Sequence, residues 1–111
     1  EKMVEACEYL TGTPVGEKAA VIGDMAELGE LTERAHKEIG ALTKELGIDT
    51  VIAIGARAKY FTEGNPSAHW FGSVDEAMGA VKAAFTAETA MLVKASHSMH
   101  FEKIVEELTK A

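Results

Sequence analysis

The chain has 111 residues, of which 47% are hydrophobic and 26% are charged, and its net charge at neutral pH is −7. These values are typical of one small globular domain and exclude a disordered chain. The acidic balance argues against a nucleic-acid partner and against an anionic membrane surface, because both require a basic face. No apolar stretch approaches the roughly 20 residues that cross a bilayer, and no signal peptide is visible.

The cysteine content excludes an intramolecular disulfide, because Cys7 is the only cysteine. This agrees with a reducing compartment. Cys7 lies within an apolar helical pattern, so we expect it to be a small buried hydrophobic residue. The chain starts at Glu1 rather than at a methionine, which indicates a piece of a longer protein.

The first half of the chain predicts two helices and one strand. The apolar spacing from Glu1 to Leu10 suits one face of a helix, which ends in the Thr11–Pro14 segment because proline cannot continue it. A short apolar run from Lys18 to Gly23 has the length of a strand. A long amphipathic helix is expected from Glu30 to Leu46, with Thr32 as its N-cap.

The second half predicts three strands and three helices. Thr50 to Gly55 is the clearest strand, because it is rich in β-branched residues. Ser73 is expected to be the N-cap of a later helix, with Glu76 completing a capping box. The other elements, in chain order, are a short helix from Ala58 to Phe61, a loop from Glu63 to Ser67, a weak strand from His69 to Phe71, a helix that ends near Phe85, a strand from Ala90 to Lys94 and a closing helix from Ser98 or Met99 to Lys110.

This alternation of helices and strands predicts an α/β fold, with a mostly parallel sheet and helices on both faces. We expect residues 1–111 to form one domain. The chain opens with a helix, whereas a doubly wound unit usually opens with a strand, so we expect that a first strand has been lost upstream of Glu1. The segments that end at Gly23 and Lys94 are expected to be neighbouring parallel strands whose tips open on the same rim.

Polar side chains follow the strand that ends at Gly23. Asp24 and Glu27 lie in the turn, and His36 lies one turn into the next helix. Ligands of open α/β sheets bind beyond the carboxyl ends of the strands, and paired carboxylates can bind Mg²⁺, orient an amine or transfer protons. The alternative is that Asp24 caps a turn, that Glu27 is solvated and that His36 is a packed, hydrogen-bonded residue.

A second polar turn follows the strand that ends at Lys94. Lys94, Ser96 and the backbone N–H groups of a helix N-terminus could hold an anion, with His97 beside them. Alternatively, Ser96 or Ser98 only caps the last helix. His97 and His100 have the i, i+3 spacing of metal ligands, but no cysteine or second histidine pair supports a metal site.

Two further candidate residues and the absence of several motifs limit the reactions that this chain could carry out alone. Arg57 follows a strand end and could meet a phosphate or carboxylate, although a solvated surface position is the main expectation. His69, next to Trp70, is expected to be structural. The sequence contains no phosphate loop, no glycine-rich dinucleotide fingerprint and no recognisable Ser–His–Asp arrangement. The phosphate-binding groups of any ATP-using enzyme would therefore lie elsewhere.

The two polar turns together resemble those of the C-terminal domain of the Mur ligases. The stretch from Gly23 to Glu30 with His36, and the stretch from Leu92 to Glu102, carry this resemblance, which covers essentially the whole chain. Within the family, the chain looks most like the ligases that add D-Ala-D-Ala to a UDP-MurNAc-peptide. The resemblance implies a cytoplasmic, three-domain enzyme of peptidoglycan-precursor synthesis that uses ATP and Mg²⁺. Its Rossmann-like C-terminal domain closes over ATP and helps to place the dipeptide.

The resemblance also implies roles for individual residues. Six residues are expected to face the substrate or the nucleotide: Asp24, Glu27, His36, Lys94, Ser96 and His97. No catalytic residue and no metal ligand is expected in this chain, which alone should be inactive and should bind no cofactor. The alternative function is a non-catalytic α/β module that binds a partner or self-associates through an exposed sheet edge.

The sequence departs from the family pattern in two places. The family's Lys-Gly-Ser-Arg motif reads Lys94-Ala95-Ser96-His97 here, and histidine lacks the permanent charge and the planar fork of arginine. The family's Tyr-Asn-Ala-Asn-Pro segment, which approaches the nucleotide, would lie just before Glu1.

Overall fold

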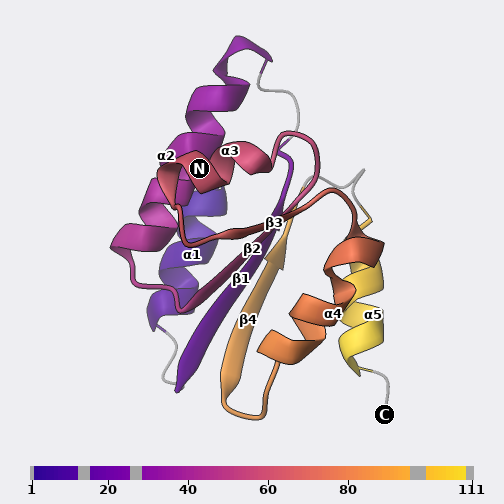
Figure 1. The fold of residues 1–111 in the computed structure, drawn as a ribbon. Helices are drawn as coiled ribbons and strands as arrows, with labels where there is room; N and C mark the ends of the chain where they lie inside the picture. Colours follow the sequence, from indigo (N-terminus) through magenta and orange to yellow (C-terminus); the bar gives the residue numbers. More distant parts are fainter. Residues whose placement is uncertain (1, 13–15, 26–28, 96–99, 110–111) are drawn as a thin grey trace.

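The computed structural model describes residues 2–12, 16–25, 29–95 and 100–109. Helices and strands alternate along them, as the sequence predicts (Figure 1). The elements are α1 (Lys2–Gly12), β1 (Glu17–Gly23), the 3₁₀ turn η1 (Gly29–Leu31), α2 (Thr32–Glu45), β2 (Thr50–Ile54), α3 (Lys59–Gly64), β3 (His69–Phe71), α4 (Val74–Ala84), β4 (Thr89–Lys94) and α5 (Glu102–Thr109).

The strands of the described part form one parallel sheet in the order β3-β2-β1-β4. The prediction of an α/β fold with a mostly parallel sheet is therefore confirmed. Ile22 of β1 pairs with Lys94 of β4, and Gly23 pairs with Ile54 of β2. The predicted neighbours, the strands ending at Gly23 and Lys94, thus lie side by side, and their carboxyl ends open on one edge of the sheet.

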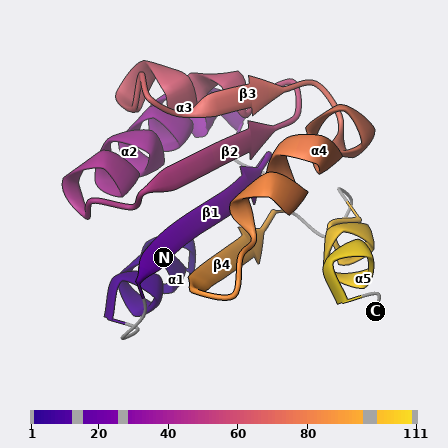
Figure 2. The ribbon, with the colours of Figure 1, turned by 60° about the horizontal axis from the view of Figure 1, so that its bottom comes forward.

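Helices cover both faces of the sheet (Figures 1 and 2). One core lies between the sheet and α1, α2 and α3, and it includes Cys7 as a buried hydrophobic residue. The other lies between the sheet and α4 and α5. Successive side chains of β1 point to opposite faces of the sheet, so Ile22 packs into the first core and Val21 into the second. A strand buried on both faces reads as a continuous apolar run, which is why β1 and β2 are visible in the sequence.

The two predicted N-caps have opposite outcomes. The hydroxyl oxygen of Ser73 accepts a hydrogen bond from the backbone N–H of Glu76 at 3.2 Å, so the cap of α4 is confirmed. The cap of α2 was predicted wrongly, because the N-cap position is Leu31 and Thr32 is the first residue of the helix. The 3₁₀ turn η1 leads directly into α2 and keeps Leu31 in a helical conformation.

The closing helix starts later than the sequence suggests. It begins at Glu102, whereas the prediction placed its start at Ser98 or Met99, which lie outside the described residues. His100 has a φ of 54°, a left-handed conformation that a right-handed helix cannot contain. The described part of the chain therefore enters α5 only after His100.

No helix of the described part is long and apolar enough to cross a membrane.

Two glycines allow α2 and α3 to pack with their backbones almost in contact. A Cβ atom on Gly40 would lie 2.0 Å from the carbonyl oxygen of Phe61, and a Cβ atom on Gly64 would lie 2.1 Å from that of Lys37. Backbone atoms cannot move aside as a flexible side chain can. Any larger residue at either position therefore forces the two helices apart.

We expect Gly40→Ala to lower the free energy of unfolding by about 1–3 kcal/mol, the usual effect of overpacking a core. Gly79→Ala is the matched control, because Gly79 lies within α4 and a Cβ atom there would meet nothing within 4 Å. That control should gain about 0.5–1 kcal/mol from the better helix propensity of alanine. Urea denaturation of both variants measures the difference, and an equal effect of the two substitutions would contradict the close packing.

Candidate functional site

The carboxyl edge of the sheet gathers three chain segments. Asp24 follows β1, Gly55 follows β2, and Lys94 is the last residue of β4. The pairing of β1 with both neighbours brings these ends together. This edge is where open parallel sheets bind their ligands, because the loops that leave the strands converge there.

Asp24 is 9% exposed, and its carboxylate binds the backbone of the neighbouring loop. Its Oδ1 accepts hydrogen bonds from the backbone N–H of Arg57 at 2.9 Å and from that of Ala58 at 2.7 Å. These N–H groups lie just before α3, so a side chain that follows β1 caps the entry into a helix that follows β2. The sequence allowed for a capping role at this position, but could not show that the capped segment is 33 residues away.

Gly55 makes room for the carboxylate of Asp24. Gly55 has a φ of 121°, and a Cβ atom there would lie 2.6 Å from Oδ1 of Asp24. Its carbonyl oxygen accepts a hydrogen bond from Nε1 of Trp70 at 2.8 Å, and its N–H donates to the carbonyl oxygen of Phe71 at 3.0 Å. Trp70 of β3 therefore has a contact at this edge that the sequence did not reveal.

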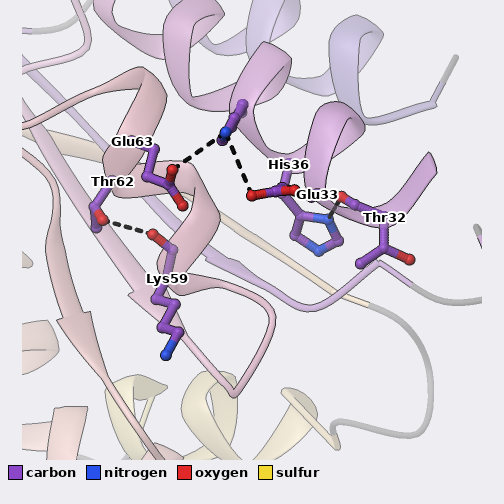
Figure 3. Close-up of polar contacts among 7 residues, drawn as sticks. Thr32, Glu33, His36, Lys59, Thr62 and Glu63 are labelled. Carbon is purple, nitrogen blue, oxygen red and sulfur yellow. Dashed lines mark hydrogen bonds and ion pairs between the residues drawn. The ribbon is translucent and has the colours of Figure 1, made fainter. Parts of the chain in front are cut away.

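His36 is fully buried, and both of its ring nitrogens are engaged within the chain. Nε2 accepts a hydrogen bond from the backbone N–H of Met25 at 3.1 Å. Nδ1 lies 2.6 Å from the carbonyl oxygen of Thr32 and therefore carries the hydrogen that it donates (Figure 3). The ring also packs against Phe61, with 4.8 Å between the ring centroids.

Lys94 lines a shallow pocket of about 220 Å³ between the end of β4 and the start of α5. Glu102 is the other charged residue of this pocket, and its Oε1 lies 3.1 Å from Nδ1 of His100. The remaining lining residues are apolar: Val93, Ala95, Phe101 and Val105. Glu102 was missed as a candidate, although its position at the start of the last helix, close to Lys94 in sequence, was a usable signal.

The predicted site residues thus fall into two groups. Asp24, His36 and Lys94 lie at or directly behind the carboxyl edge of the sheet. The other three predicted residues, Glu27, Ser96 and His97, lie outside the described residues. The side chain of Arg57 is exposed, in agreement with the main expectation for it.

The described residues do not fit a bound metal ion. No group of three or more histidine, cysteine, aspartate or glutamate side chains within them could hold one. Oδ1 of Asp24 already accepts hydrogen bonds from two backbone N–H groups, and both ring nitrogens of His36 are hydrogen-bonded within the chain. We therefore derive no chemical step that passes through Mg²⁺ from this part of the chain.

Comparisons with known proteins agree with this geometry. No protein-family model matches the chain. The UDP-N-acetylmuramoyl-tripeptide--D-alanyl-D-alanine ligase of Bacillus subtilis is 34% identical over 115 residues, which cover 97% of this chain and 24% of that ligase. The crystal structure of MurF from Acinetobacter baumannii matches with a TM-score of 0.85 at 26% identity, over 96% of this chain and 25% of that protein.

In sequence and in fold, the chain is similar to the C-terminal domain of these ligases. It spans about a quarter of the length of the Mur ligases that it matches. A further match is the structure of MurF from Thermotoga maritima in complex with ADP, which has a TM-score of 0.81 at 23% identity and covers 96% of this chain and 24% of that protein. This last likeness concerns the fold alone.

One surface cluster of the described residues contains a lysine with a shifted pKa. Lys37 of α2 lies 3.2 Å from Oε1 of Glu63 in α3 and 3.4 Å from Oε1 of Glu33, one turn earlier in α2 (Figure 3). The hydrogen bonds to Glu63 and then to Glu33 raise the pKa of Lys37 above its ordinary value. The cluster joins the two helices that Gly40 and Gly64 bring together.

We expect Lys37→Gln to destabilise the chain at neutral pH, but not at strongly alkaline pH. Because the pKa is raised in the folded state, the stabilisation is complete below the unfolded value of roughly 10.4 and is lost as the pH rises through the folded value. Denaturation of the native chain and the variant from neutral to alkaline pH measures this convergence. Lys59→Gln is the control, since Lys59 makes no ion pair with the described residues. A convergence of equal size for both variants would contradict the assignment.

Proposed function

We propose that this chain is the closing domain of a Mur ligase that joins D-Ala-D-Ala to a UDP-MurNAc-peptide. The reaction would use ATP and Mg²⁺, for which the described residues offer neither a phosphate loop nor a metal cluster. The relatives carry the name of this ligase. The observation that supports the proposal best is the shared carboxyl edge, where the two strands that lead into the family motifs end side by side, with a small pocket beside the end of β4.

The pocket suits the two ends of a small zwitterionic dipeptide. The ammonium of Lys94 would attract the terminal carboxylate, and the carboxylate of Glu102 would attract the amine that reacts. Apolar neighbours such as Val93 and Ala95 would contact the two methyl groups of D-Ala-D-Ala. The volume of about 220 Å³ is smaller than the range of about 300–1,000 Å³ that drug-sized ligands need, which favours a small ligand.

The contribution of this domain to catalysis would be positioning rather than proton transfer. Holding the dipeptide amine close to an activated acyl group converts a bimolecular encounter into a nearly unimolecular step. Glu27, Ser96 and His97 belong to the same two turns, and we include them in the surface that faces the substrate or the nucleotide. Asp24 and His36 would serve that surface indirectly, because their polar atoms bind the backbone.

The proposal places the enzyme in the cytoplasm and assigns it no nucleic-acid or membrane partner. Cys7 is buried and is the single cysteine of the chain, so it forms no disulfide within it, as expected in a reducing compartment. The net charge of −7 disfavours polyanionic partners.

A second candidate function is supported by one observation. β3 and β4 are the edge strands of the described sheet, and edge strands can pair with a further chain. A non-catalytic module would use such an edge to bind a partner or a second copy of itself. This alternative predicts dimers of the isolated chain in analytical ultracentrifugation, and it predicts no ligase activity in any context.

Activity of a complete ligase that carries this domain tests the proposal. Lys94→Gln should raise the KM for D-Ala-D-Ala about tenfold or more, since a charge-assisted hydrogen bond contributes about 1.5–3 kcal/mol. Lys82→Gln is the control, because it removes the same charge from a lysine that pairs with Glu107 and does not line the pocket. His97→Arg should keep the activity and make it less dependent on pH, because arginine stays charged.

The isolated chain should bind ATP weakly or not at all. A low-micromolar ATP dissociation constant for these 111 residues, or an unchanged dipeptide KM in the Lys94→Gln ligase, would contradict the proposal.

A further inference from the structure

Two buried side chains make hydrogen bonds at the point where the chain leaves β1. The carboxylate of Asp24 accepts a hydrogen bond from the loop after β2, and the imidazole of His36 in α2 accepts one from the backbone N–H of Met25. Residues 26–28, which follow Met25, lie outside the described part of the chain. We call Asp24 and His36, together with the backbone groups that they bind, the β1 exit clasp.

The carboxylate side of the clasp joins β1 to the start of α3. Oδ1 of Asp24 is the common acceptor for two successive N–H groups, those of Arg57 and Ala58. Gly55 lets the carboxylate approach closely, since a side chain there would collide with it. Without the carboxylate, the N–H groups of Arg57 and Ala58 would have no hydrogen-bond acceptor, which is costly for a buried donor.

The imidazole side of the clasp joins the same turn to α2. A backbone N–H can only donate, so the hydrogen bond from Met25 requires that Nε2 of His36 carries a lone pair. The hydrogen must then sit on Nδ1, where the carbonyl oxygen of Thr32 accepts it. Both nitrogens are therefore used inside the protein, and the fully buried ring has no free atom for a ligand.

We propose that Asp24 and His36 are positioning residues: they fix Met25 and the loop before α3 at the carboxyl edge of the sheet, where the substrate would bind, without touching the substrate themselves. This inference rests on the proposed ligase function. It separates two roles at one edge of the sheet. The clasp residues act through Met25 and the loop before α3, whereas a group such as the Lys94 ammonium would make the contacts.

Two substitutions of His36 isolate its hydrogen bond with the backbone N–H of Met25. Glutamine can place its carbonyl oxygen where Nε2 lies and so accept from Met25, whereas asparagine reaches only the position of Nδ1 and keeps the bond to Thr32. In the 111-residue chain, amide hydrogen exchange at Met25 should be at least tenfold faster in His36→Asn than in His36→Gln. Equal exchange rates at Met25 in the two variants would overturn the inference.

Asp24 provides an independent pair of variants. Asp24→Asn keeps an oxygen that can accept from Arg57 and Ala58, and Asp24→Ala does not. Exchange at these two amides should accelerate at least tenfold in the alanine variant and much less in the asparagine variant. An alanine variant that leaves both amides as protected as in the native chain would refute the carboxylate side of the clasp.

A kinetic experiment separates positioning from mere stability. In the complete ligase, His36→Asn should raise the KM for D-Ala-D-Ala about tenfold above that of His36→Gln, because small displacements of binding groups cost large factors. The control is Thr43→Val, which removes a buried hydroxyl that accepts from Asn65 at 3.0 Å and donates to Gly40. This control should lower the melting temperature and leave the KM unchanged.

The outcomes distinguish the clasp from the proposed function. An equal rise of KM in His36→Asn and Thr43→Val would show a purely structural role and refute positioning. An inactive ligase with the native chain would refute the proposed function, and the exchange rates of Met25 would then decide on the clasp alone.

Discussion

The parallel pairing of β1 with β4 is the constraint on which the rest of the structure depends. Because Ile22 lies beside Lys94, two motifs that are about seventy residues apart leave the sheet at the same edge. Pairing on the other side places Gly23 beside Ile54, so the loop before α3 joins them. A shift of one residue in either register would turn each buried side chain of β1 toward the opposite core and would separate the two turns.

The edge that results is held by buried polar groups rather than by charge pairs. The side chains of Asp24 and His36 bind backbone N–H and carbonyl groups, and Nε1 of Trp70 donates a hydrogen bond to the carbonyl oxygen of Gly55. The ion pairs of the described residues, by contrast, are largely solvent-exposed, and exposed pairs contribute little to stability. This arrangement suits a binding surface. The buried hydrogen bonds hold the backbone at the edge, and charged groups such as Lys94 can bind a ligand.

The sequence was sufficient for the fold and for the pairing of the strands that end at Gly23 and Lys94, but not for the contacts of the side chains beyond them. Strands β1 and β2 were visible because burial on both faces leaves an uninterrupted apolar run. The partners of Asp24 were not predictable, because they are backbone groups that only the tertiary fold brings close. Thr32 and the start of α5 were predicted wrongly, because a 3₁₀ turn and the left-handed His100 alter the helix starts without a clear sequence signal.

The account is tested most directly by mapping where the ligand binds on an isotopically labelled domain within the complete ligase. Addition of D-Ala-D-Ala with a non-hydrolysable ATP analogue should shift the amide signals of Met25, Ala95 and Glu102, which lie at the carboxyl edge of the sheet. The amides of Lys18 and Thr89 at the amino edge should keep their positions. Shifts confined to the amino edge, or to the outer surface of α1, would contradict the claim that the ends of β1 and β4 form the ligand-facing rim.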